Sequence, residues 1–140
     1  MSDAPLRAAC LCGAVRLEAD PPSKFLAHCH CENCRRAHGA AFVTWIGFPR
    51  AAFRVAGGAD ELARYATDTG ATRSFCRRCG STLLYESPRW PDDVHVAAGA
   101  LLDPPDRAPG AHVYADRAVG WCALADELPR YGGPDGTTPL

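Results

Sequence analysis

Lysine is nearly absent from this 140-residue sequence, which contains only Lys24. Arginine therefore supplies almost all of the positive charge. It favours planar, two-point contacts with carboxylates, although a biased genome composition would produce the same excess. The formal net charge is −1, so the protein as a whole generates no positive field that would attract nucleic acid or an anionic membrane surface. We expect no nucleic-acid partner.

Long apolar runs are also missing. No run approaches the ~18 residues that span a bilayer, and residues 1–7 lack the basic stretch and apolar core of a secretory signal. The hydrophobic content of 47% and the charged content of 22% are typical of a globular protein. These features predict a cytoplasmic protein without membrane association, with one domain over residues 1–131 and a flexible C-terminal tail over 132–140.

Cysteine, by contrast, is abundant. Seven of the eight cysteines fall into three groups, namely Cys10 and Cys12, then Cys29, Cys31 and Cys34, then Cys76 and Cys79. Thiols at such short spacings in a protein without a secretory signal bind metal more often than they form disulfides, because the cytosol keeps thiols reduced. Four disulfides remain the alternative.

The seven thiols divide naturally into four and three. A structural zinc takes four ligands in a closed tetrahedron, whereas a catalytic zinc keeps three protein ligands and one open position. Two pairs that are distant in sequence would join remote parts of a sheet, so we assign the structural zinc to Cys10, Cys12, Cys76 and Cys79. Gly13 and Gly80 follow these pairs and can adopt the positive φ that a turn around a metal requires.

The remaining thiols, Cys29, Cys31 and Cys34, form a compact group that we call the tripod. It would leave one position on a second, labile zinc for water or a substrate thiol, so we predict that these three residues are catalytic. Two alternatives stay open. A fourth ligand would close the site if it came from His28, His30, His38 or Cys122, or the thiols could form an empty, redox-labile site.

Four further residues are candidates for the site or its surroundings. Arg35 and Arg36 flank the tripod and could bind a substrate carboxylate, with an ordinary solvated surface as the alternative. His112 is interpreted as a structural histidine with satisfied hydrogen bonds rather than a catalytic one. Cys122 is expected to be a buried apolar cysteine.

The apolar pattern predicts a mainly β protein. Residues 32–38 are expected to form one or two helical turns capped by Gly39, and residues 53–65 a hairpin that turns at 57–60. Residues 101–110 are expected to be irregular, and 121–124 to be a last apolar anchor. Strands are predicted over 13–20, 24–28, 40–48, 53–55, 61–65, 72–75, 82–86 and 94–98, with 112–116 as a last strand or extended segment.

The motifs together resemble the family of glutathione-dependent formaldehyde-activating enzymes and centromere protein V. The resemblance runs from Cys10 to about Tyr131, and it rests on Cys10-x-Cys12-Gly13-x-Val15, Cys29-His30-Cys31-x-x-Cys34-Arg35, Gly39, Phe75-Cys76-x-x-Cys79-Gly80, and His112-Val113-Tyr114-x-Asp116 followed by Trp121. It implies an Mss4-like fold, a zinc-stapled β-sheet with short helical turns. It also implies that the outer four cysteines hold structural zinc and that the tripod is linked to activity.

The resemblance further implies a carbon–sulfur lyase that uses a small thiol and an aldehyde. The reaction that names the family adds the thiol of glutathione to formaldehyde and gives S-hydroxymethylglutathione. Fold and family alone do not determine the substrate. The alternative is a non-catalytic binding module that zinc stabilises, because the sequence marks no definite general base near the tripod.

Overall fold

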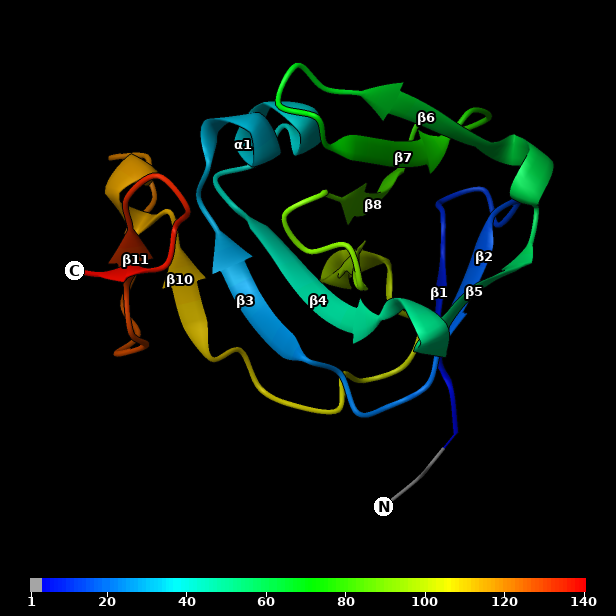
Figure 1. Ribbon diagram of the computed structural model, residues 1–140, viewed down its shortest axis with the longest axis horizontal. Helices are drawn as coiled ribbons and strands as arrows, with labels where there is room; N and C mark the ends of the chain where they lie inside the picture. Colours follow the sequence, from blue (N-terminus) through cyan, green and yellow to red (C-terminus); the bar gives the residue numbers. More distant parts are fainter. Residues whose placement is uncertain (1–3) are drawn as a thin grey trace.

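The computed structural model describes residues 4–140, in which two main β-sheets face each other across an apolar core and β11 and β12 form a small third sheet (Figure 1). The smaller sheet has the strand order β1-β2-β5, and the larger has the order β10-β3-β4-β9-β8-β7-β6. Neighbouring strands are antiparallel except for β10, which runs parallel to β3. The fold is therefore mainly β, as predicted.

The strands are β1 (Leu6–Ala9), β2 (Arg16–Ala19), β3 (Phe25–Cys29), β4 (Val43–Pro49), β5 (Phe53–Gly57), β6 (Leu62–Ala66), β7 (Thr72–Cys76), β8 (Thr82–Glu86), β9 (Asp93–Ala97), β10 (Ala111–Val113), β11 (Tyr131–Gly132) and β12 (Thr138–Pro139). The helical elements are α1 (Glu32–His38) and the short 3-10 turns η1 (Arg50–Ala52), η2 (Ala59–Glu61), η3 (Ala98–Ala100) and η4 (Ala115–Arg117). Among the described residues, no helix has the length and apolar character needed to cross a membrane.

Helix α1 follows the prediction closely. Gly39 caps it with φ 61°, and the Gly39 N–H donates to the carbonyl of Arg35. Its N-cap is Cys31, whose sulfur accepts a hydrogen bond from the Cys34 N–H. A tripod cysteine thus begins the helix, a role that is usually filled by Ser, Thr, Asp or Asn.

Strand β4, which was predicted over residues 40–48, is buried on both faces. Ile46 and Phe48 pack into the main core between the two sheets. Val43 and Trp45 belong instead to a second buried cluster, together with the tripod. Because side chains alternate along a strand, β4 separates the main core from the tripod.

The predicted hairpin over residues 53–65 is wrong. Both strands exist, but β5 pairs with β2 in the small sheet, whereas β6 pairs with β7 in the large one. Gly58, with φ 74°, lies so close to Ala14 that an added Cβ would fall 1.8 Å from the Ala14 carbonyl oxygen. The glycines are therefore needed where the chain crosses between sheets, not for a two-strand turn.

Strand β1 was not predicted. It is four residues long, and its sequence, Leu-Arg-Ala-Ala, lacks the β-branched and aromatic residues that favour strands. The strand forms because it pairs with β2, a contact that the local sequence does not indicate.

The C-terminal region differs from expectation in two respects. Trp121 is 76% exposed, so residues 121–124 do not anchor the chain as predicted. Residues 132–140 include β12, which pairs with β11, and the Leu140 N–H donates to the carbonyl of Arg130. The segment is thus hydrogen bonded, and its flexibility in solution stays a prediction. The predicted domain starts at residue 1, and residues 1–3 lie outside the described part of the chain.

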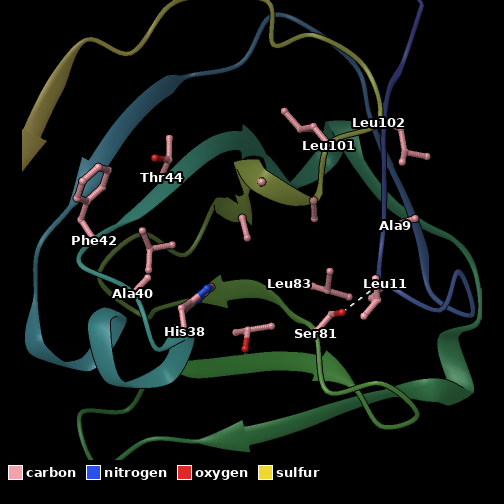
Figure 2. A pocket seen from close by; sticks show the side chains of 15 residues that line it. Ala9, Leu11, His38, Ala40, Phe42, Thr44, Ser81, Leu83, Leu101 and Leu102 are labelled. Carbon is pink, nitrogen blue, oxygen red and sulfur yellow. Dashed lines mark hydrogen bonds between the residues drawn. The ribbon is translucent and has the colours of Figure 1, made fainter.

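A cavity of about 520 Å³ lies at one end of the large sheet (Figure 2). Its walls come from α1, β4, β8, the β9–η3 segment and the chain around β1. No tripod cysteine lines this cavity.

Candidate functional site

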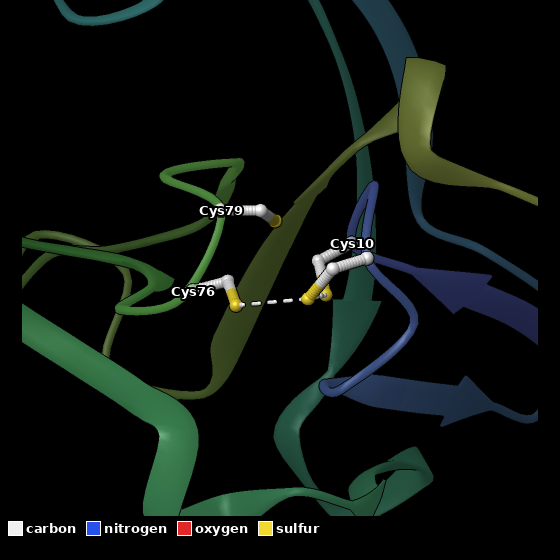
Figure 3. Close-up of side chains that lie close together, drawn as sticks. Cys10, Cys76 and Cys79 are labelled. Atoms are coloured by element: carbon white, nitrogen blue, oxygen red, sulfur yellow. Dashed lines mark hydrogen bonds between the residues drawn. The ribbon is translucent and has the colours of Figure 1, made fainter.

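The outer four cysteines converge between two turns that are far apart in sequence. Cys10 and Cys12 lie on the turn between β1 and β2, and Cys76 and Cys79 lie on the hairpin between β7 and β8 (Figure 3). All four sulfur atoms lie within 4.8 Å of one another. The predicted grouping is therefore confirmed as geometry.

In each turn, the backbone curves around the cysteine sulfurs. Gly13 and Gly80 have φ angles of 79° and 78°, as their positions after the cysteine pairs predicted. The Val15 N–H points at the sulfur of Cys10, at 3.2 Å. Hydrogen bonds from Ser81 lower the pKa of Cys79 to about 5. These contacts favour the thiolate form of Cys10 and Cys79, which is the form that binds metal.

The spacing of these sulfurs fits zinc. A tetrahedral zinc with Zn–S bonds of about 2.3 Å places neighbouring sulfurs about 3.8 Å apart. The Cys10 and Cys12 sulfurs are 3.6 Å apart, and those of Cys12 and Cys76 are 3.8 Å apart. All eight cysteines are free thiols, so the disulfide alternative finds no support here.

The tripod is assembled at the junction of β3 and α1. Cys29 ends the strand, Cys31 caps the helix, and Cys34 lies in its first turn. The Cys34 and Cys29 sulfurs are 3.5 Å apart, and the three sulfurs lie within 4.8 Å of one another. Cys29 and Cys34 are buried, whereas Cys31 is partly exposed.

Within residues 4–140, no histidine, cysteine or carboxylate joins the three tripod sulfurs as a fourth ligand. The histidines proposed as closing ligands have other contacts: His28 pairs with Thr44 Oγ1 at 2.8 Å, and His30 Nε2 pairs with His112 Nδ1 at 2.8 Å. His38 packs edge-on against Trp45. The geometry therefore favours the three-ligand arrangement over a site closed by the protein.

The three thiols do not share one electrostatic environment. Interactions with the side chains of Cys29 and Cys31, together with the Arg73 guanidinium, lower the pKa of Cys34. Hydrogen bonding among the three thiols and burial raise the pKa of Cys29. The Arg73 guanidinium therefore favours the thiolate form of Cys34.

Arg73 is the site residue that sequence reasoning missed. It lies in β7, is only 7% exposed, and donates from Nη2 to the Cys34 sulfur at 3.4 Å. Its guanidinium carbon lies 5.0 Å from the centre of the Tyr85 ring. Its Nη1 is buried and has no hydrogen-bond partner among the described residues. The available signal was an arginine inside the strand predicted over residues 72–75.

The two arginines predicted to bind a carboxylate make only local contacts. Arg35 donates to the carbonyl of His30 at 3.3 Å, and Arg36 donates to the side chain of Asn33 at 3.3 Å. Their role in substrate binding stays a prediction.

His112 is buried, and both of its ring nitrogens have partners. Nδ1 faces His30, and Nε2 lies 2.9 Å from a carboxylate oxygen of Asp126. The interpretation of His112 as a satisfied structural histidine agrees with this geometry. Cys122, expected to be buried, is only partly buried and joins neither cysteine group.

Comparison with known proteins connects this geometry to one family. The family model of the glutathione-dependent formaldehyde-activating enzymes matches residues 5–117. A Halomonas elongata protein, whose name assigns it provisionally to these enzymes, is 32% identical over 129 residues, which cover 85% of this chain and 80% of that protein.

Two further proteins are similar. A Schizosaccharomyces pombe protein named as an uncharacterised lyase is 33% identical over 81 residues, 54% of this chain and 53% of its own length. A Rhodobacter sphaeroides crystal structure from structural genomics has a TM-score of 0.61 and 30% identity, and it covers 72% of this chain and 92% of its own. The chain belongs to the glutathione-dependent formaldehyde-activating enzyme family.

Proposed function

We propose that the protein is a zinc-dependent carbon–sulfur lyase that adds glutathione, or another small thiol, to formaldehyde or a related aldehyde and catalyses the reverse cleavage. The observation that carries this proposal is the tripod, in which three converging thiols have no fourth protein ligand among residues 4–140. The name of the Schizosaccharomyces pombe relative, an uncharacterised lyase, supports the same class of reaction, and the name of the Halomonas elongata relative supports glutathione and formaldehyde as the reactants.

The reaction itself is simple in its balance of bonds. A carbon–sulfur bond forms, the carbonyl π bond breaks, and the thiol proton ends on the former carbonyl oxygen. Zinc held by Cys29, Cys31 and Cys34 would favour the thiolate form of an incoming thiol. The remaining task is to hold the two reactants together, which contributes a large share of the rate in such additions.

Arg73 is placed to stabilise the negative charge that develops on the carbonyl oxygen during the addition. Its Nη2 contacts the Cys34 sulfur, and its buried Nη1, which has no hydrogen-bond partner among residues 4–140, places a further donor beside the tripod. Arg35 and Arg36 are the candidates for a carboxylate of glutathione. The outer four cysteines would hold the structural zinc and have no part in the chemistry.

Exchange spectroscopy tests this function directly. Zinc-loaded protein is mixed with glutathione and formaldehyde, and the rate of adduct exchange is followed by NMR. We expect acceleration over buffer, its loss in Cys31→Ser, and its retention in Cys122→Ser, which alters a cysteine outside both groups. No acceleration by the wild type would exclude this substrate pair and favour the zinc-stabilised binding module.

A further inference from the structure

The cavity in Figure 2 arises where β9 leaves the large sheet. Strand β9 separates β4 from β8 as far as Ala97, and the chain then turns away as η3. Beyond that point, Thr44 of β4 and Thr82 of β8 line one shared space. A volume of about 520 Å³ is in the usual range for a small-molecule site, roughly 300–1,000 Å³.

Among the described residues, no Asp, Glu, Lys or Arg side chain lines the cavity. Most of its wall is apolar, from alanines, leucines, Phe42 and Val43. Glutathione carries two carboxylates and an ammonium group, and burying those charges without partners would cost far more than the apolar contacts return. The cavity is therefore unsuited to glutathione and suited to an uncharged molecule.

The hydroxyl groups in the wall are already used. Thr82 donates to the carbonyl of Ala37, Ser81 accepts from the Leu11 N–H, and Thr44 pairs with His28. His38 is different, because its Nε2 is buried without a hydrogen-bond partner among residues 4–140. Figure 2 shows the His38 ring extending from the end of α1 into the cavity.

The cavity adjoins the tripod. His38 lies four residues after Cys34, on the same face of α1. Val43 and Ala97 line the cavity and also belong to the buried cluster that contains Cys29 and Cys34. A molecule held here would therefore have one end near the thiols.

We propose that this cavity binds the hydrocarbon chain of an uncharged aliphatic aldehyde, whose carbonyl oxygen accepts a hydrogen bond from His38 Nε2. The identification of the bound molecule as an aldehyde rests on the proposed function, whereas the binding site itself does not. Formaldehyde has no chain to fill this space, so the cavity defines a preference for longer aldehydes.

Binding is tested without catalysis, with 1-hexanol as an unreactive probe. Its titration into the zinc-loaded protein is followed by amide NMR shifts of residues around the cavity. We expect saturable binding, weakened about tenfold in His38→Phe, which keeps the ring but loses the nitrogen. His95→Phe, a matched change outside the cavity, should bind as the wild type does, and hexanoate should bind at least tenfold more weakly.

Three results would overturn the site: no saturable shifts, equal affinity in His38→Phe, or equal binding of hexanoate. Ala100→Leu narrows the cavity and should weaken 1-hexanol binding independently of His38. In the exchange assay, the same variant should lower the ratio of kcat/KM for hexanal to that for formaldehyde. If 1-hexanol binds but no thiol–aldehyde exchange occurs, the proposed function fails and the cavity remains a binding site.

Discussion

The guanidinium of Arg73 donates a hydrogen bond to the sulfur of Cys34, 39 residues away in sequence. This contact places a buried positive charge against the tripod. It connects β7, which lies next to the edge strand β6 of the large sheet, to the β3–α1 junction that holds the thiols.

Arg73→Met should therefore slow thiol–aldehyde exchange without unfolding the protein. Loss of one charge-assisted hydrogen bond predicts a decrease of about ten- to a hundredfold in rate, and Arg73→Lys should recover part of it. Exchange rates at fixed pH and saturating zinc, with circular dichroism for the fold, provide the measurement. Arg77→Met alters an exposed arginine and is the control; a rate in Arg73→Met equal to that of this control would refute the role of Arg73.

The two cysteine groups should differ sharply in their effect on stability. Structural zinc contributes about 10–16 kcal/mol in small peptides, comparable with the whole stability of a domain. Cys76→Ser should therefore prevent stable folding, whereas Cys34→Ser should cost about 1–3 kcal/mol as a buried hydroxyl. Thermal unfolding compares the two, and equal melting temperatures would contradict the division into four and three.

His112→Phe should destabilise the protein by leaving His30 Nε2 buried without a partner. The expected cost is about 1–3 kcal/mol in the free energy of unfolding, measured with urea. Asp126→Asn should have a smaller effect, because Asp126 is partly exposed and asparagine keeps an acceptor. A stability of His112→Phe equal to that of Asp126→Asn would argue that the histidine pair has no structural role.

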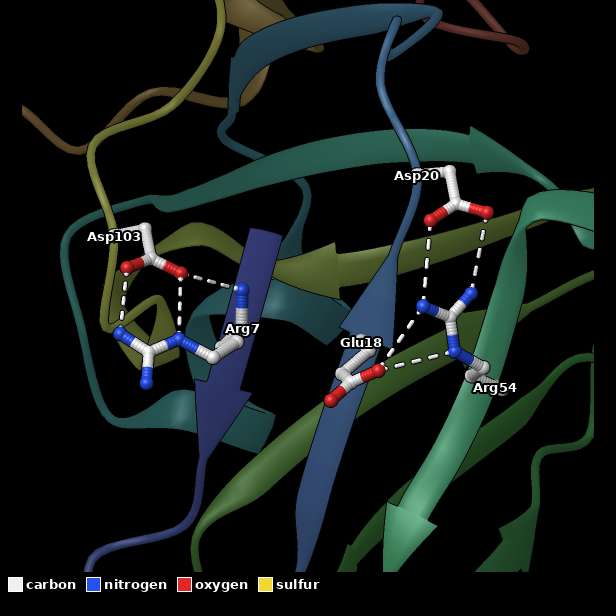
Figure 4. Close-up of polar contacts among 5 residues, drawn as sticks. All are labelled: Arg7, Glu18, Asp20, Arg54 and Asp103. Atoms are coloured by element: carbon white, nitrogen blue, oxygen red, sulfur yellow. Dashed lines mark hydrogen bonds and ion pairs between the residues drawn. The ribbon is translucent and has the colours of Figure 1, made fainter. Parts of the chain in front are cut away.

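The ion pair between Arg7 and Asp103 predicts that the free energy of unfolding depends on pH. Arg7 contacts Asp103 through its side chain and its backbone N–H, and these hydrogen bonds lower the pKa of Asp103 below its usual 3.8 (Figure 4). A carboxyl whose pKa is lowered on folding stabilises the fold fully above its unfolded value, and this stabilisation is lost as the pH falls through the folded value.

The difference in unfolding free energy between the wild type and Asp103→Asn should thus be present at pH 6 and shrink steadily below pH 3.8. Urea titrations across this range measure it. Asp68→Asn, which changes an exposed residue, should show no such trend. A difference that stays constant with pH would show that the pair does not act through the charge of Asp103.

The cysteine groups could be predicted because metal ligands impose their own spacing on the sequence. The turn glycines and helix α1 could also be predicted, because a positive φ and a helix C-cap both favour glycine at a defined position in the local sequence. Both groups of thiols are where the spacing indicated.

Pairing between distant strands left no such signal. The glycines at 57 and 58 are typical of a hairpin, yet the close approach of Gly58 to Ala14 directs the chain to another sheet. Arg73 was missed for the same reason, because its partner sulfur is brought to it by the fold and not by sequence neighbours. Trp121 was expected inside on hydrophobicity alone, and it is exposed.

Metal stoichiometry tests the central claim most directly. The variant with Cys29, Cys31 and Cys34 all changed to serine should stay folded and retain one zinc per chain by elemental analysis, one fewer than the fully loaded wild type. The same zinc content in both proteins, or loss of all zinc and of the fold in the triple variant, would contradict the assignment of the tripod as a separate, labile site.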